Sequence, residues 1–282
     1  MPYPISYTPE GLALGDKPRF VSATDGDTPT IDVPVRMLGM DAPELHYAGA
    51  SETKPGKFDA ALEHVLSGPG SHLDPGLQEY LEPKLRSNPS TRHILQGVAA
   101  FAHFEQIVAA RLKRISTSSG AELTPRRLFT KVSEQVFDRY GRMLAYVAPA
   151  YTRAERDTIP PKDRPTFNLQ MVRDGHAISL LIYPNVPKPS DLDLVRSAIK
   201  KARQYNRGVW GGPHEPLHAY EYRWLVDVHR GQRDGPTRFC GDMTTAKLYV
   251  PQQYYKVPDE NRLWFFEEDV GRAYEMGFTL AI

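Results

Sequence analysis

Three short stretches of the chain carry the residue types that hydrolysis of a phosphate ester requires. They are residues 25–28 (DGDT), 36–44 (RMLGMDAPE) and 138–142 (DRYGR). This reaction needs a metal ion or other cations on the nonbridging oxygens, a positioned water, and stabilisation of charge as phosphorus becomes five-coordinate. Each stretch alone is typical of an ordinary turn, so the prediction depends on the three together.

The acidic and basic side chains in these stretches suit complementary tasks. Asp27 and Asp41 offer hard oxygen ligands of the kind that Ca²⁺ prefers. Arg36 and Arg142 belong to separate predicted strands and can hold one phosphate from two sides, because guanidinium is planar, always charged and bidentate. A surface salt bridge is the alternative role for each arginine.

The elements that must position these residues are short strands and three helices. Alternating apolar residues predict strands at 20–23, 31–38, 128–137, 143–147 and 177–183. Apolar residues at three- and four-residue spacing predict a helix from about 93 to 114, and two more helices are predicted at about 167–172 and 190–207. This pattern fits a small β-barrel with helices packed on it, an α+β fold.

Residues 46–92 differ in composition from the rest, since Gly, Pro, Ser and His are frequent there. We expect a surface-packed insertion of loops and one short helix, near Glu44, that serves as a lid, a substrate selector or a dimer contact. The histidines at 46, 64, 72 and 93 fall at no metal-ligand spacing, so exposed or capping roles are expected for them.

The order and spacing of the three stretches resemble the thermonuclease, or staphylococcal-nuclease-like, family. The similarity continues through residues 168–175, 183–185 and 198–210, and it covers about residues 18–212 apart from the insertion. It implies a five-stranded OB-type barrel with three helices. Residues 1–212 are therefore expected to form the nuclease domain, and residues 213–282 a small C-terminal α+β accessory module.

The resemblance also implies roles for individual residues. The matching positions are Arg36, Glu44 and Arg142 for catalysis, Asp27, Asp41 and Ala42 for the metal, and Arg139, Tyr140 and Tyr183 for the substrate. In the family the glutamate orients or deprotonates the attacking water, and Ala42 would contribute only its backbone carbonyl. The implied ion is Ca²⁺, with other divalent ions possible. Tyr183 can equally be a core residue at the rim of the barrel.

The C-terminal stretch distantly resembles the small zinc-binding module of Ada-type DNA repair proteins. The shared features are short, namely residues 258–263 and Gly277-Phe278. The cysteines that would hold zinc are absent, because Cys240 is the only cysteine in the chain. No zinc is therefore expected, and apolar packing by residues such as Trp264 would have to replace it.

Composition excludes several classes of protein. The 282 residues include 35 Lys and Arg against 34 Asp and Glu, and this balance excludes a strongly basic histone-like protein and an acidic solvating tail. One cysteine cannot form an internal disulfide. No apolar run approaches the roughly 18 residues of a membrane span, and no signal peptide is recognised, so a cytoplasmic protein without a membrane partner is expected.

Taken together, the sequence predicts a metal-dependent endonuclease that cleaves DNA and RNA with little sequence specificity. Because free Ca²⁺ is scarce in cytosol, we expect restraint by weak metal binding, by the insertion, or by an inhibitory or targeting protein partner. The alternative is a catalytically silent OB-fold module that binds nucleic acid or protein. Silent copies usually lose an Asp or an Arg, whereas both Asp, both Arg and the Glu are present here.

Overall fold

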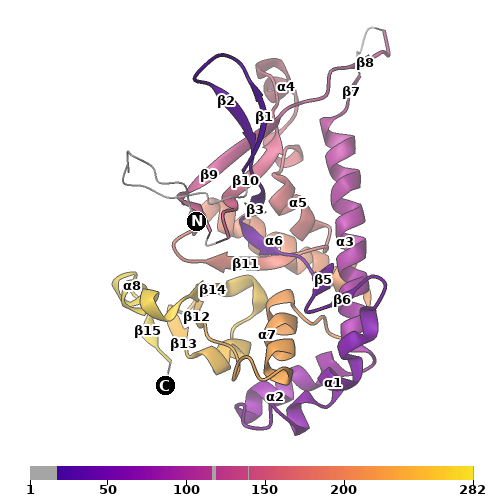
Figure 1. Ribbon diagram of the computed structural model, residues 1–282. Helices are drawn as coiled ribbons and strands as arrows, with labels where there is room; N and C mark the ends of the chain where they lie inside the picture. The colour runs from indigo at the N-terminus through magenta and orange to yellow at the C-terminus, as the bar shows by residue number, and fades with distance from the viewer. Residues whose placement is uncertain (1–17, 116–118, 139, 282) are drawn as a thin grey trace.

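The computed structural model describes residues 18–115, 119–138 and 140–281 (Figure 1). Near the N-terminus, β1 (Arg19–Ala23) and β2 (Pro29–Asp32) form an antiparallel hairpin. A three-stranded sheet has the order β3 (Val35–Met37), β10 (Met143–Pro149) and β9 (Leu128–Phe137). The expected strand 31–38 is thus two strands, which separate at Pro34 because proline has no N–H for a ladder.

A six-stranded sheet joins strands from both ends of the chain. Its order is β4 (Gly39–Asp41), β11 (Ile178–Ile182), β14 (Arg262–Phe265), β12 (Phe239–Asp242), β13 (Lys247–Tyr249) and β15 (Thr279–Leu280). Next to the edge strand β4, β11 pairs antiparallel with β4 and parallel with β14. The last strands of the chain therefore extend the sheet that contains β4, the strand of Asp41.

The three predicted helices are present, with shifted ends. They are α3 (Pro89–Leu112), α5 (Phe167–Arg173) and α6 (Pro189–Gln204). A short helix, α4 (Arg153–Thr158), lies in the stretch between β10 and α5. The long α3 runs along one side of the molecule and ends beside the small hairpin of β7 (Arg114–Ile115) and β8 (Glu122–Leu123) (Figure 1).

The expected α+β class is confirmed. The ladders between described residues do not close into one barrel, because the β1–β2 hairpin, the β9–β10 sheet and the six-stranded sheet are hydrogen-bonded separately. Within the part of the chain that the structure describes, no helix is both long and apolar enough to cross a lipid bilayer.

The sequence led us to expect an insertion that packs on the surface. In the structure the insertion also contributes residues to the core. It forms β5 (His46–Tyr47), β6 (Ala50–Ser51), α1 (Asp59–Glu63), α2 (Pro75–Leu81) and several 3₁₀ turns. Leu62, Leu77 and Leu81 are fully buried, in the same apolar cluster as Tyr222 and Leu225. Its leucines are therefore core residues, and removing them from water stabilises the fold.

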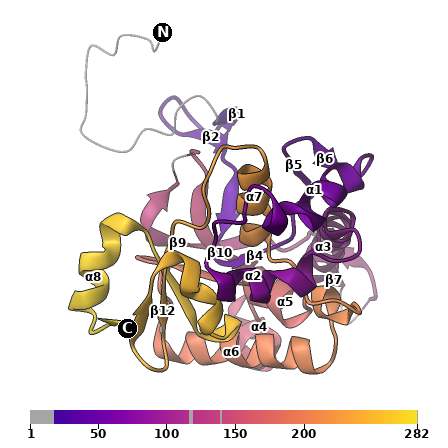
Figure 2. The ribbon, with the colours of Figure 1, turned by 90° about the horizontal axis from the view of Figure 1, so that it is seen from below.

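The helix α7 (Ala219–His229), which belongs to the C-terminal stretch, contributes Tyr222 and Leu225 to this cluster. Figure 2 shows α7 beside α1 and α2, and α7 contacts α1 and the 3₁₀ turn at Val65–Ser67. The last helix, α8 (Val270–Glu275), lies at the far end of the C-terminal strands. A domain boundary near residue 212 stays a prediction, but the residues on its two sides share one sheet and one core.

Candidate active site

Asp41 is the buried centre of the candidate site. It ends β4, where it pairs with Ile178 of β11, and its side chain is only 1% exposed. Oδ1 accepts a hydrogen bond from Arg36 Nη2 at 2.8 Å, and Oδ2 accepts one from Arg223 Nη2 at 2.7 Å. Burial alone would raise the pKa of Asp41, but Arg223 and Arg36 outweigh it and hold this pKa at about 2.

Arg36 reaches this carboxylate from β3. Its Nη2 also donates to the Met40 carbonyl at 3.3 Å, so the backbone of β4 helps to fix the side chain. The side chain remains 31% exposed. The side chain is therefore partly open to solvent, as binding of a phosphate requires.

Arg223, a residue of α7, joins Asp41 to Glu44. Its Nη1 donates to Glu44 Oε1 while its Nη2 holds Asp41. Burial raises the pKa of Glu44 in spite of Arg223, and the two carboxylates raise the pKa of Arg223 against the effect of its own burial. Sequence reasoning did not include Arg223 in the site.

The backbone of Glu44 is held by His93 of α3. Its N–H donates to His93 Nε2 at 2.9 Å, so the imidazole must carry its proton on Nδ1, which donates to the Leu217 carbonyl at 3.0 Å. His93 is buried and stacks on Tyr222 with ring centroids 4.2 Å apart. Burial lowers the pKa of His93 to about 3 and keeps the ring neutral.

The expected exposed or capping role of His93 is therefore wrong. The prediction failed because His93 lies at the predicted start of its helix, whereas α3 begins four residues earlier at Pro89. Gly97, one turn further along α3, allows the chain to approach, because a Cβ there would lie 2.2 Å from the Glu44 carbonyl oxygen. His93 and Gly97 together hold the backbone of Glu44 against α3.

Arg142 follows the turn between β9 and β10. Its Nε donates to Asp138 Oδ2 at 2.7 Å, and its guanidinium lies 5.4 Å from the centre of the Tyr140 ring. The side chain of Arg142 is 38% exposed, and Tyr140 is exposed as well. Since β10 pairs in parallel with β3, with Leu144 opposite Arg36, the two arginines project from neighbouring strands. Arg139 lies outside the described residues.

The predicted metal ligands are not grouped. Asp27 lies in the exposed β1–β2 turn, where its Oδ1 accepts from the Thr28 hydroxyl at 3.2 Å. Both oxygens of Asp41 are bound by guanidinium groups, and Ala42 packs against the core. Among residues 18–115, 119–138 and 140–281, no three carboxylate, imidazole or thiolate side chains gather as a metal site.

The space beside Asp41 also argues against an ion there. The cavity that Asp41 lines with Pro43 and Leu217 measures about 10 Å³, room for one water at most. Ca²⁺ takes six to eight oxygen ligands, and in this arrangement both oxygens of Asp41 already accept hydrogen bonds from guanidinium groups. As arranged, the residues present do not fit a calcium ion.

Tyr183 lies away from this cluster, at the end of β11. Its N–H donates to the Trp264 carbonyl at 2.9 Å, and its ring stacks on Phe265 at 5.6 Å. These contacts are those of the core alternative. Its contact with a nucleotide stays a prediction.

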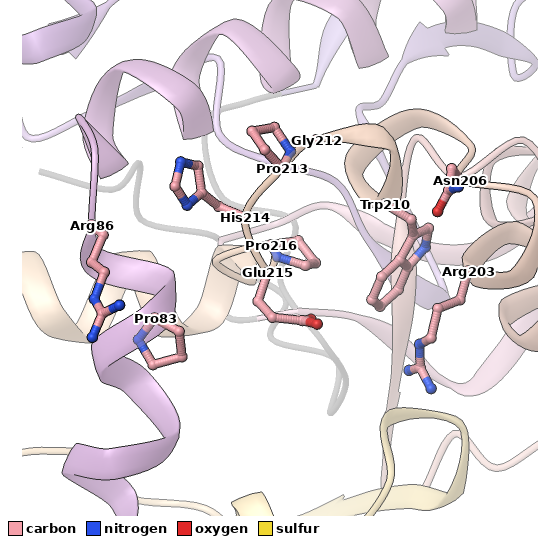
Figure 3. Close-up of a pocket in the computed structure, with 10 residues that line it drawn as sticks. All are labelled: Pro83, Arg86, Arg203, Asn206, Trp210, Gly212, Pro213, His214, Glu215 and Pro216. Atoms are coloured by element: carbon pink, nitrogen blue, oxygen red, sulfur yellow. The ribbon is translucent and has the colours of Figure 1, made fainter.

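A separate hollow lies elsewhere in the described part of the chain. Figure 3 shows a cavity of about 450 Å³ that is lined by Arg86, Arg203, Trp210 and the loop at residues 212–216. Arg86 pairs with Glu82 and Arg203 with Asp259, so both cations already have acidic partners. None of the predicted site residues lines this cavity.

Comparison with known proteins adds two findings. Residues 102–212 match the sequence profile of the family described as Staphylococcal nuclease homologue. The chain is also similar to Endonuclease YhcR of Bacillus subtilis (strain 168), with 26% identity over 225 residues. This similarity covers 78% of the chain but only 17% of that relative, so the chain spans a small part of its length. The matched segment includes Arg142 and ends before Arg223.

Proposed function

Because residues 102–212 carry a domain of the staphylococcal nuclease family, we propose that this protein hydrolyses phosphodiester bonds of DNA and RNA. The observation that carries the proposal lies outside the matched segment. There, Arg36 and Glu44 converge on one buried carboxylate, that of Asp41, through direct and Arg223-mediated contacts. Two separate parts of the chain thus support the same chemistry.

The reaction we propose begins with the scissile phosphate against the exposed part of Arg36. Arg142 lies directly before β10, the neighbour of β3. Its side chain would contact the same phosphate after releasing Asp138. Two guanidiniums then stabilise the charge that grows on the nonbridging oxygens. Asp41 does not touch the phosphate in this scheme. Its role is to orient Arg36.

Glu44 is the group proposed to take a proton from the attacking water. The water oxygen attacks phosphorus, one water proton passes to the Glu44 carboxylate, the P–O5′ bond breaks, and the leaving oxygen takes a proton from solvent. A 3′-phosphate and a 5′-hydroxyl result, as the family resemblance implies. A carboxylate whose pKa is raised by burial is a stronger base than an exposed one, which suits this task.

No step is derived through Ca²⁺, because the residues as arranged do not fit the ion. Cleavage in Ca²⁺ and in EDTA tests whether the activity depends on calcium. DNA and RNA are both proposed as substrates, because the groups assigned to this scheme would contact phosphate, which the two polymers share.

The test is a cleavage assay with single-stranded DNA, supercoiled plasmid and RNA, each in Ca²⁺, Mg²⁺, Mn²⁺ and EDTA. Wild type is compared with Arg36→Ala, Glu44→Gln and the control Arg272→Ala, which removes an arginine of an exposed ion pair with Glu275. We expect cleavage by wild type and the control, and a loss of about 100-fold or more in the two site variants. Equal cleavage by all four proteins would refute the assigned site. Binding without cleavage in every metal would support the silent module instead.

A further inference from the structure

We infer that Arg223 supplies, within the phosphate-binding site, the positive charge for which a divalent ion was expected. Nucleic-acid binding and cleavage by this protein then require no divalent ion. The inference rests on the proposed nuclease function and goes beyond it, because it adds a catalytic residue from the C-terminal stretch.

The first support is the place of the guanidinium. Arg223 binds Asp41 Oδ2 at 2.7 Å and also holds Glu44, so it occupies the position between the two carboxylates that a cation would take. With Arg36 on the other oxygen of Asp41, two positive charges balance two negative ones. The cluster is neutral before the substrate binds, so it offers a divalent ion no net negative charge.

The second support is that Arg223 is built into the core and does not fold over the site from the surface. Its helix, α7, is fixed by Glu221, whose carboxylate is fully buried and accepts from Lys84 Nζ at 2.9 Å. Tyr80 and Tyr254 each donate to Glu221 Oε1 at 3.0 Å. These contacts anchor the backbone of α7, and Asp41 and Glu44 hold the Arg223 side chain, which favours a permanent part of the site over a removable plug.

The third support is access. The side chain of Arg223 is 28% exposed although it holds two carboxylates, and that of Arg36 is 31% exposed. Guanidinium has five N–H donors, and each of these two arginines uses only part of its set on Asp41 and its neighbours. The remaining donors can contact two nonbridging oxygens of one phosphate from both sides of Asp41. Charge that develops on phosphorus-bound oxygen is then met by two fixed cations without metal.

The experiment compares wild type, Arg223→Ala, Arg223→Lys and the control Arg230→Ala, which removes an exposed arginine from the end of the same helix. Arg36 still pairs with Asp41 in Arg223→Ala, and circular dichroism checks that each variant folds. Three quantities are measured. They are cleavage of single-stranded DNA in EDTA and in CaCl₂, binding of a fluorescent phosphorothioate single-stranded DNA in EDTA, and heat released on titration with CaCl₂.

We expect wild type and Arg230→Ala to cut equally well, within about twofold, in EDTA and in CaCl₂, and to release no saturable heat with millimolar Ca²⁺. Arg223→Ala should lose about 100-fold in cleavage and about tenfold in binding in EDTA, while Arg223→Lys retains part of both, because it keeps the charge without the planar fork.

Two results would overturn the inference. One is a wild type that is inactive in EDTA and an Arg223→Ala variant that gains both Ca²⁺ binding and Ca²⁺-dependent cleavage, which would make Arg223 a plug. The other is Ca²⁺-dependent cleavage that is the same in wild type and Arg223→Ala. In both cases the proposed nuclease function survives. If no variant binds or cuts nucleic acid under any condition, the proposed function itself is wrong, and this inference falls with it.

Discussion

The buried ion pair between Lys84 and Glu221 ties the insertion to the C-terminal helix α7, and Lys84→Met tests what that pair contributes to stability. Lys84 Nζ lies 2.9 Å from Glu221 Oε2, and the two side chains are 4% and 0% exposed. Lys84 also donates to the Tyr80 hydroxyl at 2.6 Å. Methionine keeps the length and packing of the lysine stem but leaves the glutamate without its ammonium partner.

The magnitude follows from burial. Breaking a buried pair by removing one partner costs about 3–5 kcal/mol, because the remaining charge is uncompensated. Glu221 keeps its bonds from Tyr80, Tyr254 and the His218 N–H. We therefore expect the lower end of that range, about 3 kcal/mol, which corresponds to a fall in Tm of about 6–12 °C for a chain of this size.

The assay is urea unfolding followed by tryptophan fluorescence and circular dichroism. Arg86→Met is the matched control, since its partner Glu82 lies in the same segment but both side chains are more than 60% exposed. The control should lose less than about 0.5 kcal/mol. A loss below 1 kcal/mol in Lys84→Met, or a loss equal to that of the control, would refute the argument that this pair fixes α7 to the insertion.

Three further outcomes are expected. Gly97→Ala should lower both Tm and the cleavage rate although alanine favours helix, because its Cβ would lie 2.2 Å from the Glu44 carbonyl oxygen; an unchanged rate would contradict the assigned position of Glu44. Below pH 6.5 the free energy of unfolding should fall by about 1.4 kcal/mol per pH unit for each of His93 and His218, whose pKa values burial lowers to about 3 and about 4. The unfolded chain takes up these protons while the folded chain does not, so stability rises with pH between about 4 and 6.5. Unfolding curves at several pH values check this, and a flat profile would refute it. Arg142→Ala should reduce cleavage of single-stranded DNA by about 100-fold with Tm nearly unchanged, because Asp138 keeps its hydrogen bonds from the backbone N–H groups of residues 140 and 142.

Local sequence patterns predicted most of the helices and strands outside the insertion and before residue 213. The apolar spacing of residues 98–115 predicted a helix at 93–114, and α3 spans Pro89–Leu112. The start was placed too late because Pro89 looked like part of a loop, whereas proline is well suited to the first position of a helix. The strand that carries Arg36 was also expected, apart from the break at Pro34, whereas β4, which carries Asp41, was not predicted.

Contacts across long sequence distances could not be predicted in the same way. Leu77 and Leu81 looked like part of a surface insertion, because residues of the cluster that buries them, such as Leu225 and Tyr254, come more than 100 residues later in the chain. Arg223 and Asp41 are 182 residues apart, and no spacing rule joins them. A signal was present within α7, whose sequence AYEYRWLVDVH places two opposite charges, Glu221 and Arg223, among aromatic and aliphatic residues. Charges in such a setting are usually paired in the fold.

The most direct test of the central claim, hydrolysis of phosphodiester bonds at the Arg36–Asp41–Glu44 cluster, is mass spectrometry of the products from one defined single-stranded oligonucleotide. The account predicts fragments that end in 3′-phosphate and begin with 5′-hydroxyl, formed by wild type and absent with Arg36→Ala and Glu44→Gln. Intact oligonucleotide after incubation with wild type under every metal condition would contradict it, and so would the same fragments from the two variants at the wild-type rate.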